Sequence, residues 1–460
     1  MKQFLRLLFL ISLTATSCRR SDDKVYLTLI PAGHMTDKID LDIRTGIVNG
    51  SASDKDVKVC IYLNQISDST LIHEEDLRLE GLMSGCSSVH IPTAGMEGSN
   101  RIITTVEDGD RMVKKEESFC VEPSEIRSTE LIEGAWIGLY HWSEEEGLYW
   151  NKDIKEMTAE NWKEMVRAMH SIGMTSIVIQ EVFRNQEYVG QHGLTMENYR
   201  GKAFYPSRLY PGRMDIACED PLEAILSEAD VLKMDVFMGV GMYAWFDFTE
   251  TSLTWHKAVA KELWDMYGHH DSFYGFYVSE ECAGNLYNSE TEAGRIAMRK
   301  KEIVDFFREF RAFTNTFAPG KPVMLATNSM EVPKGADTYP HLLQHLDILC
   351  PFGFARMPEN DLSGYEAAEM LQKFCDEQGS HLWFDLEAFL FNPDMSLYPR
   401  PIEQIIGDLT LLENFEKILC YQFPGVFNSP ETMSRIVGEE RTIELFGNYR
   451  EYYEGKHLQR

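Results

Sequence analysis

The stretch FYGFYVSEE, residues 273–281, is an apolar run of strand length that ends on two glutamates, Glu280 and Glu281. Similar runs recur along the chain from residue 134 onward, with helical stretches between them. Strands that alternate with helices are typical of βα units around a parallel sheet. Eight such units over roughly 305 residues predict a (β/α)8 barrel, for which about 250 residues is typical.

The expected barrel strands share a length of nine to twelve residues and a high content of apolar side chains. They are 134–142, 175–183, 235–245, 273–281, 321–330, 346–354, 381–389 and 416–427. Among the helices, one begins at Asp220, with Pro221 in its first turn and Glu223 placed to close a capping box. The alternative is a doubly wound open sheet, which is disfavoured because no Gly-rich dinucleotide loop follows the first strand.

In the part of the chain before the barrel, the apolar residues follow a different pattern. Residues 24–124 contain short runs rich in β-branched residues, separated by Gly, Ser, Asn and Asp, with no helical stretch. This spacing predicts a small all-β sandwich of Ig-like type. We therefore expect a sandwich over 19–125 and a barrel over 131–455. The sandwich is interpreted as a spacer, with a carbohydrate-binding module as the alternative.

The first 18 residues indicate export. Lys2 and Arg6 precede a short apolar run, and small residues then lead to Cys18. This segment resembles a bacterial lipoprotein signal peptide, which implies acylation of Cys18 and anchoring in the outer membrane at the cell surface. A periplasmic location and an ordinary signal peptide are the alternatives. The membrane is expected to be a partner only through this lipid anchor.

Composition narrows the possible partners. The chain carries 73 acidic against 44 basic residues, a formal charge of −29, so nucleic acid is not an expected partner. Export permits disulfides, and Cys60 and Cys120 are candidates to bridge two strands of the sandwich. No CxxC motif occurs, and the sequence names no metal and no cofactor.

Polar and aromatic residues collect where the expected barrel strands end, and in a barrel these ends surround the active site. The candidates are Trp142, Gln180, Tyr243, Trp245, Glu280, Glu281, Asn328, Arg356, Asp385 and Glu387. Aromatic rings next to carboxylates and amides suit a sugar. Acids stand after the fourth and the seventh strand, on opposite sides of the barrel mouth, and cleavage of a glycosidic bond requires two carboxyl groups.

The motifs GFYVSEE and LWFDLEAF also carry a resemblance. The chain resembles glycoside-hydrolase-like barrel lipoproteins with an Ig-like N-terminal domain, and the clan of retaining glycosidases with catalytic acids on strands four and seven. Laid on the related strand pattern Gly-Trp-Tyr-x-Pro-x-Glu, Glu281 takes the acid/base position, Ser279 the Pro position, and Glu280 a position where Asn is usual.

This resemblance implies a retaining glycoside hydrolase with Glu281 as acid/base and Glu387 as nucleophile. Strand alternation adds that Glu280 and Glu281 cannot both point inward, whereas Asp385 and Glu387 share one face. The remaining candidates are expected to bind substrate: Gln180, Glu280, Asn328, Asp385, Tyr243, Trp245, Trp142 and Arg356.

Other classes of function remain as alternatives. A noncatalytic glycan-binding surface lipoprotein would use the same aromatic residues without two opposed acids. A metal-dependent barrel hydrolase typically has His-x-His after its first strand, and this chain reads LYHW there. The motif GHHD, residues 268–271, contains two histidines, but the sequence identifies no third ligand for a metal ion.

Overall fold

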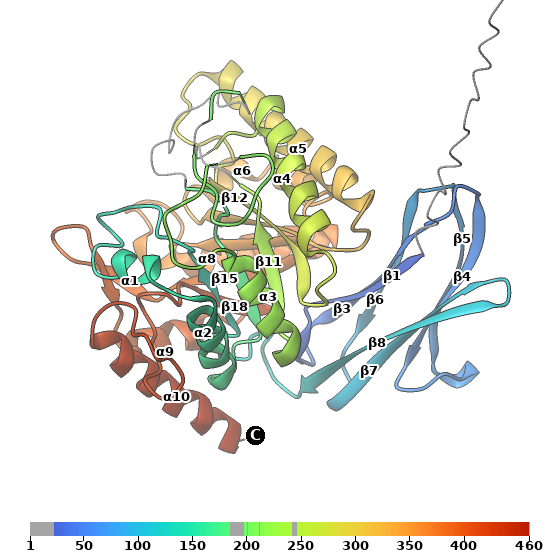
Figure 1. The fold of residues 1–460 in the computed structure, drawn as a ribbon, viewed down its shortest axis with the longest axis horizontal. Coiled ribbons are helices and arrows are strands. Elements are labelled where there is room, and N and C mark those ends of the chain that lie inside the picture. Colours follow the sequence, from blue (N-terminus) through green and yellow to red (C-terminus); the bar gives the residue numbers. More distant parts are fainter. Residues whose placement is uncertain (1–22, 185–196, 200, 211, 242–245, 460) are drawn as a thin grey trace, which may run out of the picture.

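The computed structural model describes residues 23–184, 197–199, 201–210, 212–241 and 246–459. It contains an all-β region followed by a closed barrel of eight parallel strands. Figure 1 shows the all-β region to one side of the barrel. The predicted fold class, a (β/α)8 barrel preceded by a small all-β domain, is confirmed.

The all-β region consists of two sheets. The first is antiparallel and contains β1 (Lys24–Ile30), β3 (Asp40–Val48) and β6 (Ser84–Pro92). The second has the order β2 (Gly33–Thr36), β8 (Arg111–Glu122), β7 (Gly98–Asp108), β4 (Lys55–Leu63) and β5 (Leu71–Leu79). A short 3-10 helix, η1 (Asp68–Thr70), precedes β5. Alternate side chains of these strands, including Ile43, Val59 and Ile102, form one buried apolar cluster.

The barrel closes by pairing its last strand with its first. In chain order its strands are β9 (Gly134–Ile137), β10 (Ser176–Ile179), β11 (Asp235–Gly239), β12 (Phe273–Cys282), β13 (Val323–Asn328), β14 (Ile348–Phe352), β15 (His381–Glu387) and β18 (Lys417–Tyr421). Each overlaps a strand expected from sequence. Several are shorter than expected, because the last residues of the expected run already belong to the following loop, as residues 138–142 do after β9. Trp136, Phe237, Met324 and Trp383 fill the interior.

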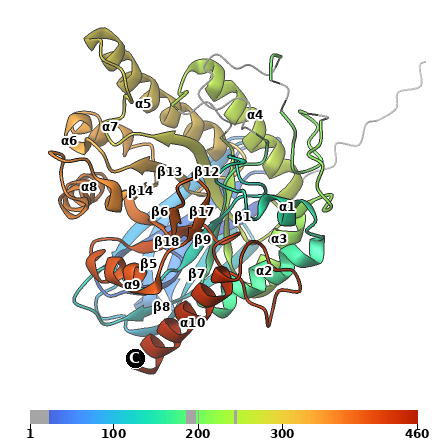
Figure 2. The ribbon, with the colours of Figure 1, turned by 90° about the vertical axis from the view of Figure 1, so that its left-hand side faces the viewer.

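Helices surround the barrel, as the end-on view of Figure 2 shows. They are α1 (Asn151–Lys155), α2 (Ala159–Ser171), α3 (Pro221–Leu232), α4 (Glu250–Tyr267), α5 (Ala293–Asn315), α6 (Val332–Gly335), α7 (Tyr339–Leu342), α8 (Gly364–Gln378), α9 (Ile402–Leu411) and α10 (Arg441–Gln459), with the 3-10 helix η2 (Phe354–Arg356). A hairpin, β16 (Phe389–Phe391) and β17 (Leu397–Pro399), follows β15. Helix α3 begins as expected, because the Asp220 side chain accepts a hydrogen bond from the Glu223 backbone N–H.

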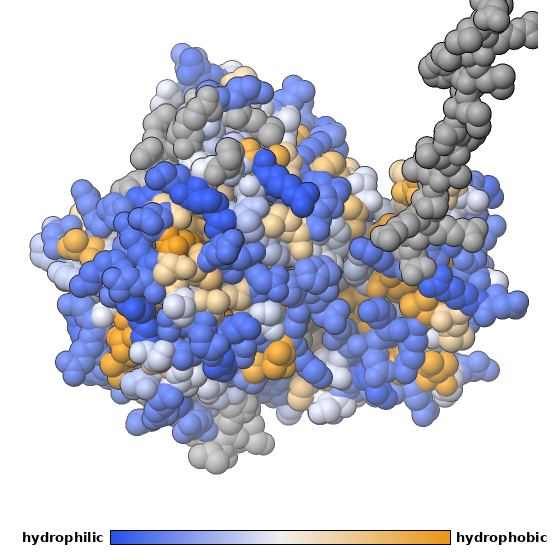
Figure 3. All heavy atoms as spheres, viewed as in Figure 1, coloured by the Kyte–Doolittle hydropathy of each residue, from blue (hydrophilic) through white to orange (hydrophobic). Residues whose placement is uncertain are grey.

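The expected capping box at α3 is wrong, because the Glu223 carboxylate faces His270 instead of turning back to the Asp220 backbone. No helix among the described residues is long and apolar enough to cross a membrane. The face of the molecule in Figure 3 is mainly hydrophilic, with apolar residues in small separate groups.

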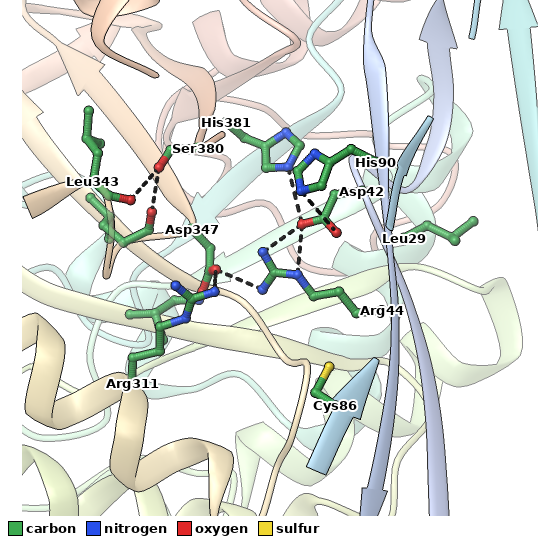
Figure 4. A network of polar contacts seen from close by, with 12 residues as sticks. Leu29, Asp42, Arg44, Cys86, His90, Arg311, Leu343, Asp347, Ser380 and His381 are labelled. Carbon is green, nitrogen blue, oxygen red and sulfur yellow. Dashed lines mark hydrogen bonds and ion pairs between the residues drawn. The ribbon is translucent and has the colours of Figure 1, made fainter. Parts of the chain in front are cut away.

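A buried ionic network joins the all-β region to the bottom of the barrel (Figure 4). Arg44 on β3 pairs with Asp42 at 2.6 Å and with Asp347, just before β14, at 2.8 Å. Arg311 on α5 also pairs with Asp347, and His381 lies 3.7 Å from Asp42. Arg44 is 7% exposed. We call these five residues the junction network; it fixes β3 against the barrel because each buried charge has a partner of opposite sign.

The disulfide considered between Cys60 and Cys120 is wrong, since both cysteines are free. Cys60 lies across β7 from Lys114, through Thr105, and Cys120 is six residues farther along β8. Six residues of strand span about 20 Å, whereas the Cα atoms of a disulfide lie about 4.4–6.8 Å apart. Cys282, Cys350 and Cys420, which belong to barrel strands, are buried and free.

Candidate active site

A cavity of about 280 Å³ opens at the carboxyl ends of the barrel strands. Seven of the residues singled out from the sequence line it: Trp142, Gln180, Glu281, Asn328, Arg356, Asp385 and Glu387. They come from six different strands or the loops that follow them, as the barrel geometry predicts. Tyr243 and Trp245, also singled out, lie outside the described residues.

The two glutamates at the end of β12 point in opposite directions. Glu281 lines the cavity. Glu280 is 1% exposed and places its carboxylate 3.6 Å from Nε2 of His256, which belongs to α4 in the helical layer. The prediction that Glu280 binds substrate is therefore wrong, because alternation along β12 turns this side chain away from the cavity.

Asp385 and Glu387 lie on the same side of β15, and both face the cavity. The guanidinium of Arg356, in η2 after β14, donates to both carboxylate oxygens of Glu387, with Nε at 3.2 Å from Oε2. A two-pronged contact of this kind stabilises the ionised carboxylate and fixes its orientation. Arg356 therefore fixes the position of the Glu387 carboxylate on the β15 side of the cavity.

The carboxyl group of Glu281 lies in a different environment from that of Glu387. Its pKa is raised from 4.5 to about 7, mainly by burial and also by the nearby Glu387 carboxylate, against the opposing effect of Arg356. Burial also raises the pKa of Asp385 well above its usual range, with Glu387 and Glu281 adding to the rise. Glu281 and Asp385 thus keep their protons to higher pH than free carboxyl groups do, while Glu387 is paired with a cation across the same cavity.

The cavity also offers polar atoms that protein groups leave unused. Oδ1 of Asp385 and Oε1 of Gln180 are buried and have no hydrogen-bond partner among the described residues. Oδ1 of Asn328 accepts from the backbone N–H groups of Gly284 and Met330, both at 3.1 Å, which turns the amide NH₂ away from the backbone. Unsatisfied polar atoms beside a cavity are suited to the hydroxyl groups of a ligand.

Some lining residues were not identified from the sequence. Glu146, in the loop after β9, lies in the cavity wall, and burial raises its pKa to about 7, with Glu281 adding to the rise. It is one of three successive glutamates, Glu144 to Glu146, and nothing in the sequence distinguishes it from the other two. The aromatic residues Phe389, Phe391 and Tyr421 complete the wall. Phe389 and Phe391 follow β15 closely, and this position was the only sign in the sequence that they could line the cavity.

Comparison with known proteins gives a family and a fold. Residues 132–434 match a family described as a domain of unknown function (DUF4434). No protein of curated function matches the chain. A solved structure of a proposed α-L-fucosidase from Bacteroides thetaiotaomicron aligns with a TM-score of 0.50 at 16% identity, over 72% of this chain and 97% of that one.

Two glycoside hydrolases also align, at lower scores. A family 2 β-galacturonidase from Eisenbergiella tayi has a TM-score of 0.40 at 12% identity, over 95% of this chain and 72% of that one. A β-glucuronidase from Bacteroides uniformis has 0.42 at 11%, over 93% and 50%. The resemblance to glycosidase-like barrels is confirmed at the level of the fold by the closed barrel behind an all-β region and by the alignment at a TM-score of 0.50.

Proposed function

Because the chain belongs to the family described as a domain of unknown function (DUF4434), its activity has to be inferred from its own site, and we propose that it is a glycoside hydrolase. The observation that carries this proposal is the pair of Glu281 and Glu387 in one cavity, the first with a pKa of about 7 and the second paired with Arg356. Hydrolysis of a glycosidic bond requires one protonated and one ionised carboxyl group in this arrangement.

The environments of the two glutamates assign their roles. Glu281 is the acid/base, because burial keeps its carboxyl protonated near neutral pH, so that it donates a proton to the leaving oxygen. Glu387 is the nucleophile, because Arg356 binds both of its carboxylate oxygens and orients the carboxylate toward the cavity. We propose a retaining mechanism, in which Glu387 attacks the anomeric carbon and Glu281 then activates the water that releases the sugar.

The substrate is proposed to be an oligo- or polysaccharide. Asp385, Gln180 and Asn328 provide hydrogen-bonding atoms for sugar hydroxyl groups. Trp142 and Phe391 provide rings for the apolar faces of a sugar. Arg356 serves as a positioning residue, since its observed contacts are with Glu387.

The second candidate function is noncatalytic binding of a glycan at the cell surface. The partly exposed ring of Phe391, at 38%, is the observation that favours it. Such a protein would need the aromatic residues of the cavity wall but neither carboxyl group in a particular protonation state.

The test is the release of reducing sugar from a broad panel of plant and host glycans by the chain from Ser21 onward. Glu281→Gln and Glu387→Gln are the site variants, and Glu280→Gln is the matched control because Glu280 adjoins Glu281 but faces α4. Release by the wild type and the control, lost by orders of magnitude in both site variants, supports the proposal. Equal release by all variants contradicts it, and binding without release in all of them favours the glycan-binding function.

We also propose that the protein is an exported lipoprotein of the outer membrane, acylated at Cys18, a residue outside the described part of the chain. The basis is the sequence alone. Expression of the full chain in a Gram-negative host, followed by detergent phase partition, tests it. Recovery of the protein in the detergent phase, and its loss in Cys18→Ser, is the expected result; an aqueous wild type contradicts the proposal.

A further inference from the structure

We propose that Glu223, His269 and His270 form a binding site for a divalent transition-metal ion such as Zn²⁺. Glu223 belongs to α3, and the two histidines lie in the turn between α4 and β12. One ligand atom from each of the three residues lies within 4.8 Å of the others, the only such group of three among the described residues. The turn precedes β12, whereas Glu281 is near the other end of this strand, so the site is separate from the cavity.

His270 is oriented as a metal ligand requires. It is 8% exposed, and its Nδ1 lies 2.6 Å from Oδ2 of Asp230. The second oxygen of Asp230 accepts from the backbone N–H of Ser272 at 2.8 Å, which fixes the carboxylate. Metal-binding histidines nearly always bond their second ring nitrogen to a carboxylate or carbonyl oxygen in this way. The nitrogen that remains for an ion is Nε2.

Glu223 lies where the next ligand would be. Its Oε2 is 3.1 Å from Nε2 of His270. Two ligands that each lie about 2.0–2.1 Å from a tetrahedral zinc ion are about 3.3 Å apart. The observed spacing is thus compatible with either a proton or an ion between the two atoms. Binding would replace the Nε2 proton by the ion, with little movement of either side chain.

His269 provides the third ligand. Its ring centroid is 4.2 Å from that of His270, and its side chain is exposed, so it is free to rotate toward the ion. The Glu223 side chain is half exposed, at 50%, which leaves the fourth coordination position to water. Two imidazoles and one carboxylate are a ligand set for zinc, copper or nickel rather than for calcium or magnesium.

The expected consequence is stabilisation. The ion would connect the first turn of α3 to the turn that leads into β12, the strand that carries Glu281. Binding to the folded state alone raises the midpoint of unfolding by mass action. The site lies too far along the barrel from Glu281 to take part in the reaction, so its failure and the failure of the proposed hydrolase activity are independent outcomes.

The experiment is a zinc titration of untagged protein that has been stripped of metal with a chelator, followed by competition with a chromogenic zinc chelator. We expect one bound Zn²⁺ per chain at pH 7.5, and a rise of a few degrees in Tm. His269→Ala and Glu223→Gln each remove one ligand and are expected to abolish this binding. Asp230→Asn leaves all three ligands in place and is expected to weaken it about 10–100-fold.

The matched control is His341→Ala, because His341 is an exposed histidine on α7 that is not part of the group. It should bind zinc as the wild type does. Absence of one-to-one binding in the wild type overturns the proposal. Equal binding in the wild type and in the folded variants His269→Ala and Glu223→Gln also overturns it. Circular dichroism of each variant shows whether it is folded.

Discussion

Both ends of the barrel contain buried acidic side chains, but the pKa of these acids is lowered at one end and raised at the other. In the junction network, burial opposes ionisation of Asp42 and Asp347, but the cations Arg44, Arg311 and His381 overcome it and lower the pKa of both acids. At the mouth, the pKa of Glu146, Glu281 and Asp385 is raised, because burial dominates and the neighbouring carboxylates add to it.

The difference lies in the number of partners. Two aspartates of the junction network share two guanidinium groups, and Asp42 also lies 3.7 Å from the imidazole of His381, which pairs with Glu416 at 2.6 Å. At the mouth, four carboxyl groups among the described cavity residues share the single guanidinium of Arg356. Buried charges that have partners of opposite sign hold the all-β region against the barrel. Buried charges without enough such partners cost stability, and a protein retains them where its chemistry requires them.

The largest effect is expected on activity. Glu387→Gln removes the proposed nucleophile, so kcat should fall by about 10⁴-fold or more on the substrate that the panel identifies. The fold should be intact, because Gln retains the shape of Glu. Steady-state kinetics together with circular dichroism measure this. A folded Glu387→Gln variant that keeps more than a tenth of the activity would show that the mouth does not use this carboxylate.

The next effect is expected on stability, at the other end of the barrel. Arg44→Met leaves Asp42 and Asp347 without their shared cation, and removal of one partner from a buried ionic group typically costs about 3–5 kcal/mol. Denaturant unfolding measures the change. The exposed pair of Arg78 and Asp54 provides the control, since Arg78→Met should leave the unfolding midpoint unchanged. Equal effects of the two substitutions would contradict the structural role of the junction network.

A third effect is expected on the pH profile. If Glu281 donates the proton, kcat/KM should fall about tenfold per pH unit above its pKa of about 7. Arg356 lowers this pKa, so Arg356→Met should move the alkaline limb to higher pH in addition to its cost in rate. A limb that stays in place in this variant would argue that the titrating group is not Glu281.

The smallest effect is expected on the pH dependence of stability, which has opposite signs for the buried acids at the two ends of the barrel. The folded-state pKa of Glu281, about 7, lies above the usual 4.5, so its contribution to stability is fully present below pH 4.5 and is lost as the pH rises through 7. Glu281→Gln avoids that loss and should stabilise the protein by about 3 kcal/mol at pH 8, because each unit of the raised pKa corresponds to about 1.4 kcal/mol. Near pH 4 the variant and the wild type should unfold alike. Destabilisation at pH 8 would mean that the ionised glutamate is compensated after all.

Much of this architecture could be predicted from local pattern. The alternation of strands and helices predicted the barrel, and the alternation of apolar and polar residues predicted the all-β domain. Both could be predicted because burial of one face of a strand, or of a whole strand, requires a recognisable pattern of apolar residues along the sequence. The positions of Glu281 and Glu387 could be predicted for the same reason, as each lies at the end of an apolar strand. Strand alternation also indicated that Glu280 and Glu281 diverge, although the sequence could not say which one faces inward.

The sequence by itself thus determined the order of the elements, the strands that carry the acids and the pairing of residues on one face. Only the tertiary structure decided that Glu281 faces the cavity, that Arg356 binds Glu387, and that Glu146 joins them. It also brought Glu223 beside His270 and left Cys60 far from Cys120. These relations depend on the register of the strands, the closure of the barrel and the paths of the loops. Contacts between residues distant along the chain determine all three, so no local sequence pattern predicts them.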